Sequence, residues 1–228
     1  MKQTSSPVST RGLQPKHMLF LLIALMMLVV LVRDRILLDS QHPIWKHYEP
    51  FKWWLLPHGI FAALTLLLGP LQFSSRLRRR YLNWHRISGR LYVAGVAVGV
   101  PLGIVIETIK YQIGVTPLRL LIGTIGFGSI FVVTTGMGFV LARRRRISEH
   151  QRWMTRSFAV AMVFVEVRCA DYLPWLGRII DVPGNFLETH HISDLWLYIA
   201  ISLIAAELVL RYGKAKPSQI AARVTACC

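Results

Sequence analysis

Six apolar stretches alternate with polar segments along the 228 residues of this chain. An α-helix rises 1.5 Å per residue, so roughly 20 apolar residues cross about 30 Å of membrane hydrocarbon. The pattern predicts an all-α fold, an integral membrane helical bundle of six transmembrane helices in which spans two to five form the core. The six expected spans cover about residues 18–38, 51–73, 85–110, 120–142, 153–175 and 193–211.

The flanking segments complete the predicted organisation. Residues 1–17 are polar and predict a disordered N-terminus, residues 39–50 predict a loop on the outer side, and residues 213–228 predict a tail after a transmembrane domain over 18–212. Hydrophobic residues make up 54% of the chain and charged residues only 17%, which a soluble domain of this length would not show.

Positive charge is concentrated in two of the expected loops, 74–90 and 143–153. The net charge is +16, and the loop arginines form two groups: Arg76, Arg78, Arg79, Arg80, Arg86 and Arg90, then Arg143, Arg144, Arg145, Arg146, Arg152 and Arg156. Arginine-rich loops between apolar spans are typical of the cytoplasmic side of a membrane, and this distribution argues against a nucleic-acid partner. We therefore expect a multi-pass protein of the bacterial inner (plasma) membrane with both termini in the cytoplasm.

Small residues predict where helices approach closely. Gly95, Gly99 and Gly103 are four residues apart in the third expected span and so share one helix face. Pro57 and Pro70 are expected to kink the second span, which membrane helices tolerate when neighbouring groups satisfy the freed carbonyls.

Three cysteines do not form a disulfide framework. Cys227 and Cys228 end the chain, and whether they carry lipid is open. The sequence contains neither a cysteine-rich zinc spacing nor a His-Glu-x-x-His helix, a phosphate-binding glycine loop or a Gly-x-Ser-x-Gly elbow. We accordingly assign no catalytic residues and do not predict an enzyme.

Two histidines enter apolar spans through similar arginine-rich segments. His85 is followed by Arg86 and Arg90, and His150 by Arg152 and Arg156. Imidazole is a common axial ligand of haem iron, and two facing helices can supply both ligands, while arginines can hold propionates by charge-assisted hydrogen bonds. Gly89, one turn beyond His85, would leave room for a porphyrin edge. The alternative is that both histidines are interfacial anchors.

A second set of ionisable residues is expected within the outer half of the membrane. Ionisable groups inside a span usually mark function or pairing. The set could form a proton, metal or ligand site, or a network of ion pairs in which Lys110 neutralises Glu107. Its members are His58, Glu107, Glu166, Arg168 and Asp171.

Several short motifs occur in a fixed order along the chain. They are His58, Gly69-Pro70-x-Gln72-Phe73, His85-Arg86-x-x-Gly89-Arg90-x-Tyr92, His150-x-Arg152-Trp153-Met154-x-Arg156-Ser157 and Arg168. In these motifs the chain resembles the bacterial multi-pass membrane-protein family known as domain of unknown function 2306, over about residues 55–170, with spans one and six outside that core. The resemblance implies an architecture and leaves the biochemical role open.

A looser similarity is to b561-type haem membrane proteins, in which helix-borne histidines hold haem on either side of the bilayer. The fourth span has no histidine, so this chain departs from a two-haem pattern. Three hypotheses follow: a redox protein that binds haem b through His85 and His150 and meets a quinone or an electron-transfer partner, a small transporter or proton-coupled carrier that uses the outer ionisable residues, and a non-catalytic factor that binds anionic lipid or a partner protein.

Overall fold

The computed structural model describes residues 15–34, 41, 43–172 and 195–211, and all regular structure in these ranges is helical. The helices are α1 (Pro15–Asp34), α2 (Ile44–Tyr48), η2 (Glu49–Phe51), α3 (Lys52–Gln72), α4 (Ser75–Arg80), α5 (Leu82–Gln112), α6 (Leu118–Arg143), α7 (Ile147–Tyr172) and a last helix over residues 195–211. The predicted all-α class is confirmed. Most of the predicted N-terminal segment and the terminal Cys227 and Cys228 lie outside the described residues.

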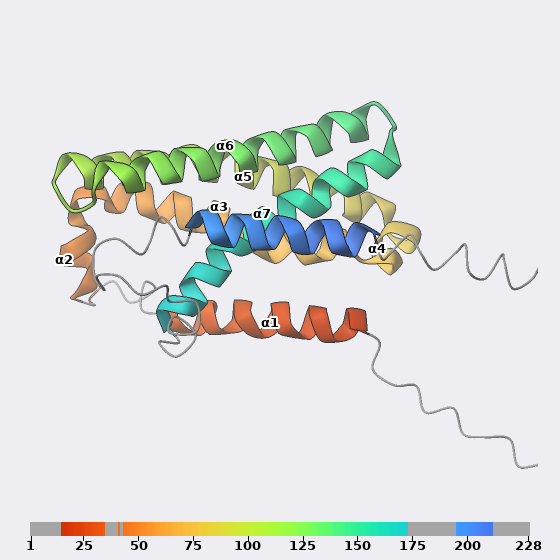
Figure 1. Ribbon diagram of the computed structural model, residues 1–228, viewed down its shortest axis with the longest axis horizontal. Coiled ribbons are helices and arrows are strands. Elements are labelled where there is room, and N and C mark those ends of the chain that lie inside the picture. The colour runs from red at the N-terminus through yellow and green to blue at the C-terminus, as the bar shows by residue number, and fades with distance from the viewer. Residues whose placement is uncertain (1–14, 35–40, 42, 173–194, 212–228) are drawn as a thin grey trace, which may run out of the picture.

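Six long helices occupy the positions of the six expected spans (Figure 1). Three helical segments within the described ranges are long and apolar enough to cross a membrane: Glu49–Gln72, Leu82–Gln112 and Leu118–Arg143. The helix α7 carries ionisable residues along its length, among them Arg156, Glu166 and Arg168, which lowers its mean hydropathy. Six transmembrane crossings remain a prediction.

The segments expected to be loops contain short helices, which corrects the predicted boundaries. The outer segment holds α2 and η2, and the first arginine-rich segment holds α4, whose N-terminus is capped by the Ser74 hydroxyl accepting from the Leu77 amide at 3.2 Å. Helix α5 begins at Leu82 rather than near residue 85, and α7 begins at Ile147 rather than at residue 153. A polar helical turn is stable here because it continues the hydrogen-bond ladder of the apolar helix that follows.

Four helices close into a bundle. Helix α3 packs along α5, α5 along α6 and α6 along α7, and α7 returns to contact α3, so α5 and α7 lie across the bundle from each other (Figure 1). Helix α1 packs on the outside of α7, where the Cys169 thiol lies 3.7 Å from the Met26 carbonyl oxygen. We call the end of the bundle that carries α4 and the turn 144–146 the arginine end, and the opposite end the far end.

The predicted glycine face of α5 is confirmed as the contact with α3. A Cβ at Gly95 would overlap the Thr65 hydroxyl and approach the Phe61 carbonyl oxygen at 3.0 Å, and a Cβ at Gly103 would lie 3.0 Å from the His58 ring. Both prolines named above lie within α3, and the helix continues through them. Glycine is therefore required at Gly95 because the two backbones approach too closely for a side chain.

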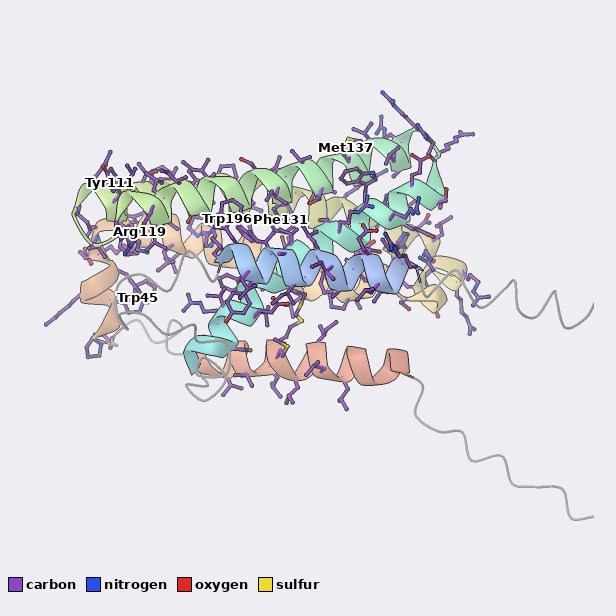
Figure 2. The ribbon with its side chains drawn as sticks, in the orientation of Figure 1. Trp45, Tyr111, Arg119, Phe131, Met137 and Trp196 are labelled. Atoms are coloured by element: carbon purple, nitrogen blue, oxygen red, sulfur yellow. The ribbon has the colours of Figure 1, made fainter. Side chains whose placement is uncertain are left out.

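Large apolar side chains cover the outside of the bundle. Met137 on α6 points away from the other helices and is 40% exposed, Ile60 on α3 is 67% exposed, and Leu21 on α1 is 64% exposed (Figure 2). Trp196 of the last helix instead packs onto α6, where a Cβ at Gly126 would meet its ring at 2.6 Å. An apolar exterior of this extent is what contact with lipid chains requires.

Candidate functional site

A buried network of three hydroxyl groups joins three helices at the centre of the bundle. The Tyr92 hydroxyl of α5 is hydrogen-bonded to the Ser157 hydroxyl of α7 at 2.9 Å, and Ser157 is hydrogen-bonded to the Thr135 hydroxyl of α6 at 2.7 Å. Tyr92 and Ser157 are fully buried and Thr135 is 2% exposed. Because burying a hydroxyl without a partner is costly, this network fixes the relative depth of the three helices.

The same network places His85 and His150 on facing sides of the bundle. Helices α5 and α7 both start at the arginine end, so they run in the same direction. His85 precedes Tyr92 by seven residues and His150 precedes Ser157 by seven, which is two turns along the same helix face, or roughly 10 Å. Since Tyr92 and Ser157 touch, the two imidazoles reach the same depth on facing helices, and they are close enough to interact electrostatically.

The two imidazoles differ in their immediate contacts. His150 Nδ1 lies 2.8 Å from the Gly138 carbonyl oxygen of α6; a carbonyl can only accept, so Nδ1 carries a proton. His85 Nδ1 is buried and has no hydrogen-bond partner among the described residues. A buried imidazole nitrogen without a partner is unusual, and it is one feature that a bound group could satisfy.

The arginines that neighbour the two histidines in the sequence have different interaction partners in the structure. His85 interacts electrostatically with Arg78 of α4 and with Arg86 of its own helix, α5. Arg156 instead bonds through Nε to the Glu207 carboxylate of the last helix at 2.6 Å, and Arg152 also acts on that carboxylate. The basic residues next to the histidine pair therefore come from α4 and α5.

The space predicted beside Gly89 is filled, which corrects the expectation of room for a porphyrin edge there. A Cβ at Gly89 would lie 3.2 Å from the Gln72 side-chain oxygen. Gln72 donates to the Ser88 hydroxyl at 2.8 Å, and Ser88 donates to the Trp84 carbonyl at 2.7 Å. Glycine at this position serves the contact between α3 and α5.

His58 occupies a similar environment at the far end. Its Nδ1 lies 2.9 Å from the Gly99 carbonyl oxygen of α5, so this nitrogen also carries a proton. Its charged neighbour is Arg168 of α7, which acts on the imidazole electrostatically and lies over the Phe164 ring at 5.5 Å. Among the five residues expected in the outer set, these two are linked by an electrostatic interaction.

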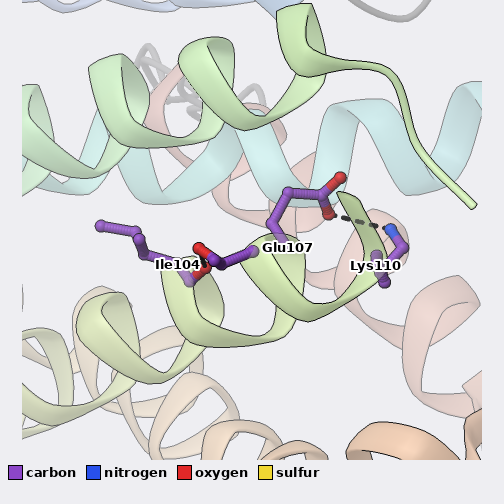
Figure 3. Close-up of polar contacts among 4 residues, drawn as sticks. Ile104, Glu107 and Lys110 are labelled. Atoms are coloured by element: carbon purple, nitrogen blue, oxygen red, sulfur yellow. Dashed lines mark hydrogen bonds and ion pairs between the residues drawn. The ribbon is translucent and has the colours of Figure 1, made fainter. Parts of the chain in front are cut away.

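The acidic members of that set have other partners. Glu107 accepts from Lys110 at 2.8 Å one turn along α5, as the ion-pair alternative predicted (Figure 3). Glu166 accepts from the Ser202 hydroxyl of the last helix at 2.7 Å. The second carboxylate oxygens of Glu107 and Glu166 are buried and have no hydrogen-bond partner in the described part of the chain. The side chain of Asp171 lies outside the described residues.

Sequence reasoning missed the hydroxyl network. Tyr92 and Ser157 stood at the ends of the two histidine motifs without an assigned role, and no motif included Thr135. The signal that could have found them is the equal spacing of seven residues from each histidine. The sequence pattern does not distinguish Thr135 from its neighbour Thr134. In the structure both residues are buried, but Thr134 donates to the Ile130 carbonyl of its own helix at 2.8 Å.

The histidine pair stands apart from any larger cluster of metal-binding side chains in the described part of the chain. Within the described residues, no group of three or more His, Cys, Asp or Glu side chains could hold a metal ion. Structural zinc takes four such ligands and catalytic zinc takes three. His85 and His150 instead form a pair of imidazoles, and His85 also interacts electrostatically with Arg78 and Arg86.

Comparison with known proteins identifies the family. No curated protein and no solved structure matches the chain. The family model described as predicted membrane protein (DUF2306) matches residues 55–210. This match includes the last helix, which corrects the expectation that the family core ends near residue 170; the last helix belongs to it because it packs on α7 through Glu166 and Ser202. The chain thus belongs to the DUF2306 family of predicted membrane proteins.

Proposed function

We propose that this membrane protein binds one haem b at the arginine end of its bundle, where His85 and His150 would hold the iron. The observation that carries the proposal is the hydrogen bond between Tyr92 and Ser157, because it sets both histidines at one depth on facing helices. Independent support comes from the buried, unpartnered Nδ1 of His85.

Each neighbouring group has a role in this proposal. The Gly138 carbonyl holds the His150 ring so that Nε2 is the nitrogen free to bind iron, the orientation that a ligating histidine normally receives from a backbone acceptor. Arg78 and Arg86 would bind propionates, and Arg90, one turn beyond Arg86, is an exposed further candidate. The haem would supply one-electron chemistry, and the chain would supply ligands, charge compensation and a closed bundle below the site.

The location of the site follows from the expected topology. If the arginine end is cytoplasmic, as the loop charges predict, the haem would lie near the cytoplasmic face of a bacterial inner membrane. It would be reached there by a quinone or an electron-transfer partner. The buried hydroxyl network of Tyr92, Ser157 and Thr135 would lie between the haem and the far end of the bundle.

The test is an absorption spectrum of the detergent-purified protein from haem-replete cells, oxidised and then reduced. We expect a Soret band, a sharpened α band on reduction, and about one haem per chain by pyridine haemochrome. His85→Ala and His150→Ala should each remove the low-spin spectrum. A colourless wild-type preparation that remains monodisperse would exclude the proposal.

His58→Ala is the matched control. His58 is also an imidazole bonded to a glycine carbonyl within the bundle, but its charged neighbour is Arg168. The control should retain the full haem content. Equal loss of haem in all three variants would show that the histidines act through folding and that the assigned ligands are wrong.

We also infer a weaker second candidate, a proton-coupled carrier using the far-end residues. It is favoured by the buried, unpartnered carboxylate oxygens of Glu107 and Glu166, which could exchange protons. In that case Glu166→Gln should abolish proton-coupled uptake in proteoliposomes at unchanged protein abundance. Loss of abundance alone would assign the carboxylates a structural role.

A further inference from the structure

The last helix is joined to α7 by an ion pair at the arginine end. Arg156 Nε lies 2.6 Å from Glu207 Oε1, with side chains 28% and 40% exposed, and the Arg156 guanidinium lies 4.9 Å from the centre of the Trp153 ring. Both side chains are partly exposed, so this contact lies at the surface of the bundle.

The two helices run in opposite directions. Glu166 pairs with Ser202, and Arg156 pairs with Glu207. A lower residue number on α7 therefore contacts a higher residue number on the last helix. Arg152 is one turn before Arg156 on the same face of α7, and Arg211 is one turn after Glu207 on the same face of the last helix. Both extra arginines therefore lie on the same side of the ion pair, toward the arginine end.

Among the described residues, this arrangement leaves positive charge uncompensated. Arg152 and Arg211 are exposed, and both are close enough to act electrostatically on Glu207 along with Arg156. Three guanidinium groups thus share one carboxylate, an excess of two positive charges. Like charges held close together repel each other, and a further anion between them relieves that repulsion.

Apolar side chains continue from this charged cluster along the last helix. Leu208 is 47% exposed, Val209 51% and Ile204 59%. In a membrane protein such side chains contact lipid chains, and the Trp153 ring is of the kind found at the level of lipid headgroups. A ligand that fits both parts has an anionic head and an apolar tail.

We propose that the cluster Arg152, Arg156 and Arg211, with Trp153, is a binding site for one anionic glycerophospholipid. Its phosphodiester accepts hydrogen bonds from the Arg152 and Arg211 guanidinium groups, and its acyl chain lies along Ile204 and Leu208. Occupancy neutralises the excess charge and holds the last helix against α7. The proposal is independent of haem binding.

Native mass spectrometry of the detergent-purified protein tests this site. The wild type, mixed with equal phosphatidylglycerol and phosphatidylcholine, should retain one phosphatidylglycerol preferentially. The double variant Arg152→Gln and Arg211→Gln should lower that affinity about thirty-fold, which corresponds to about 1 kcal/mol for each arginine. The control, Arg143→Gln with Arg144→Gln, removes the same charge from exposed residues at the end of α6 and should bind as the wild type does.

The remaining arms separate the alternatives. Excess inorganic phosphate should fail to displace the lipid; displacement would assign the site to a free phosphate and overturn the proposal, as would equal retention of the two lipids or an equal loss in the control. Arg152→Lys with Arg211→Lys keeps the charge but not the paired N–H groups, and it should bind with intermediate affinity. This variant also provides the test if the glutamine variant does not fold, and wild-type affinity in it would exclude guanidinium recognition.

Discussion

His58 and His150 make the same hydrogen bond at opposite ends of the bundle, and their surroundings make them different. Each donates from Nδ1 to a glycine carbonyl of a neighbouring helix, Gly99 at 2.9 Å and Gly138 at 2.8 Å. At the arginine end a second imidazole, His85, lies nearby, whereas at the far end the charged neighbour is the Arg168 guanidinium.

This difference shows that the same hydrogen bond can orient an imidazole in two different electrostatic surroundings. The glycine carbonyl fixes which ring nitrogen carries the proton in both places. Under the proposed function, the surroundings decide the chemistry, because a second imidazole can supply a lone pair to a metal ion and a guanidinium has none to offer.

The largest expected loss of stability comes from removing the Tyr92 side chain, which lies between the arginine end and the far end. Tyr92→Ala deletes a fully buried aromatic ring and leaves Ser157 with one hydroxyl partner, so it should lower the free energy of unfolding by about 3–5 kcal/mol. Tyr92→Phe should cost only about 1 kcal/mol, because Ser157 keeps its bond to Thr135. Denaturant titration in mixed micelles measures both. Similar losses in the two variants would show that the hydroxyl, rather than the ring, sets the register.

Two glycines sharpen the comparison of packing at the ends. Gly69→Ala would drive a methyl group into the buried Phe158 ring, which cannot move freely, and should cost about 1–3 kcal/mol. Gly99→Ala would meet Phe61 at an ordinary 3.5 Å and should change stability by less than about 0.5 kcal/mol. Thermal unfolding monitored by circular dichroism measures the loss of stability in each of the two variants. If Gly99→Ala were the more damaging variant, the far end would be the tighter one.

His58 and His150 are expected to contribute equally to stability in haem-free protein and unequally in haem-replete protein. In haem-free protein, His58→Ala and His150→Ala each remove one hydrogen bond to a carbonyl and should cost about 1 kcal/mol. In haem-replete protein only His150→Ala should lose the added stability of the bound group. Melting curves of both variants with and without haem give the four values. An equal difference at both histidines would contradict a single site at the arginine end.

The smallest effect is expected at Glu107. Its ion pair with Lys110 spans one turn of α5 and is partly exposed, so Glu107→Gln should change stability by no more than about 1 kcal/mol and should leave the haem spectrum unaltered. Lys110→Met is the matched change on the other partner. A complete loss of uptake in either variant at normal abundance would instead support the carrier hypothesis and place the active groups at the far end.

The sequence predicted the elements better than their contacts. Apolar length located the long helices, and the four-residue spacing of Gly95, Gly99 and Gly103 identified the face of α5 that meets α3, because both signals are local. The helix starts at Leu82 and Ile147 were missed, since polar first turns resemble loops in composition. The role of Gly89 was wrong for a different reason: its neighbour Gln72 comes from another helix.

What the sequence determined by itself is a helical membrane protein with two histidines at equivalent places in two similar motifs, because periodicity, length and charge asymmetry are properties of one segment at a time. Only the tertiary structure decided that α5 and α7 face each other through Tyr92 and Ser157, that Arg156 bonds to Glu207, and that Glu166 turns to Ser202. These contacts join residues 36 to 65 positions apart. They depend on how the helices rotate and cross when they pack, which no single segment specifies.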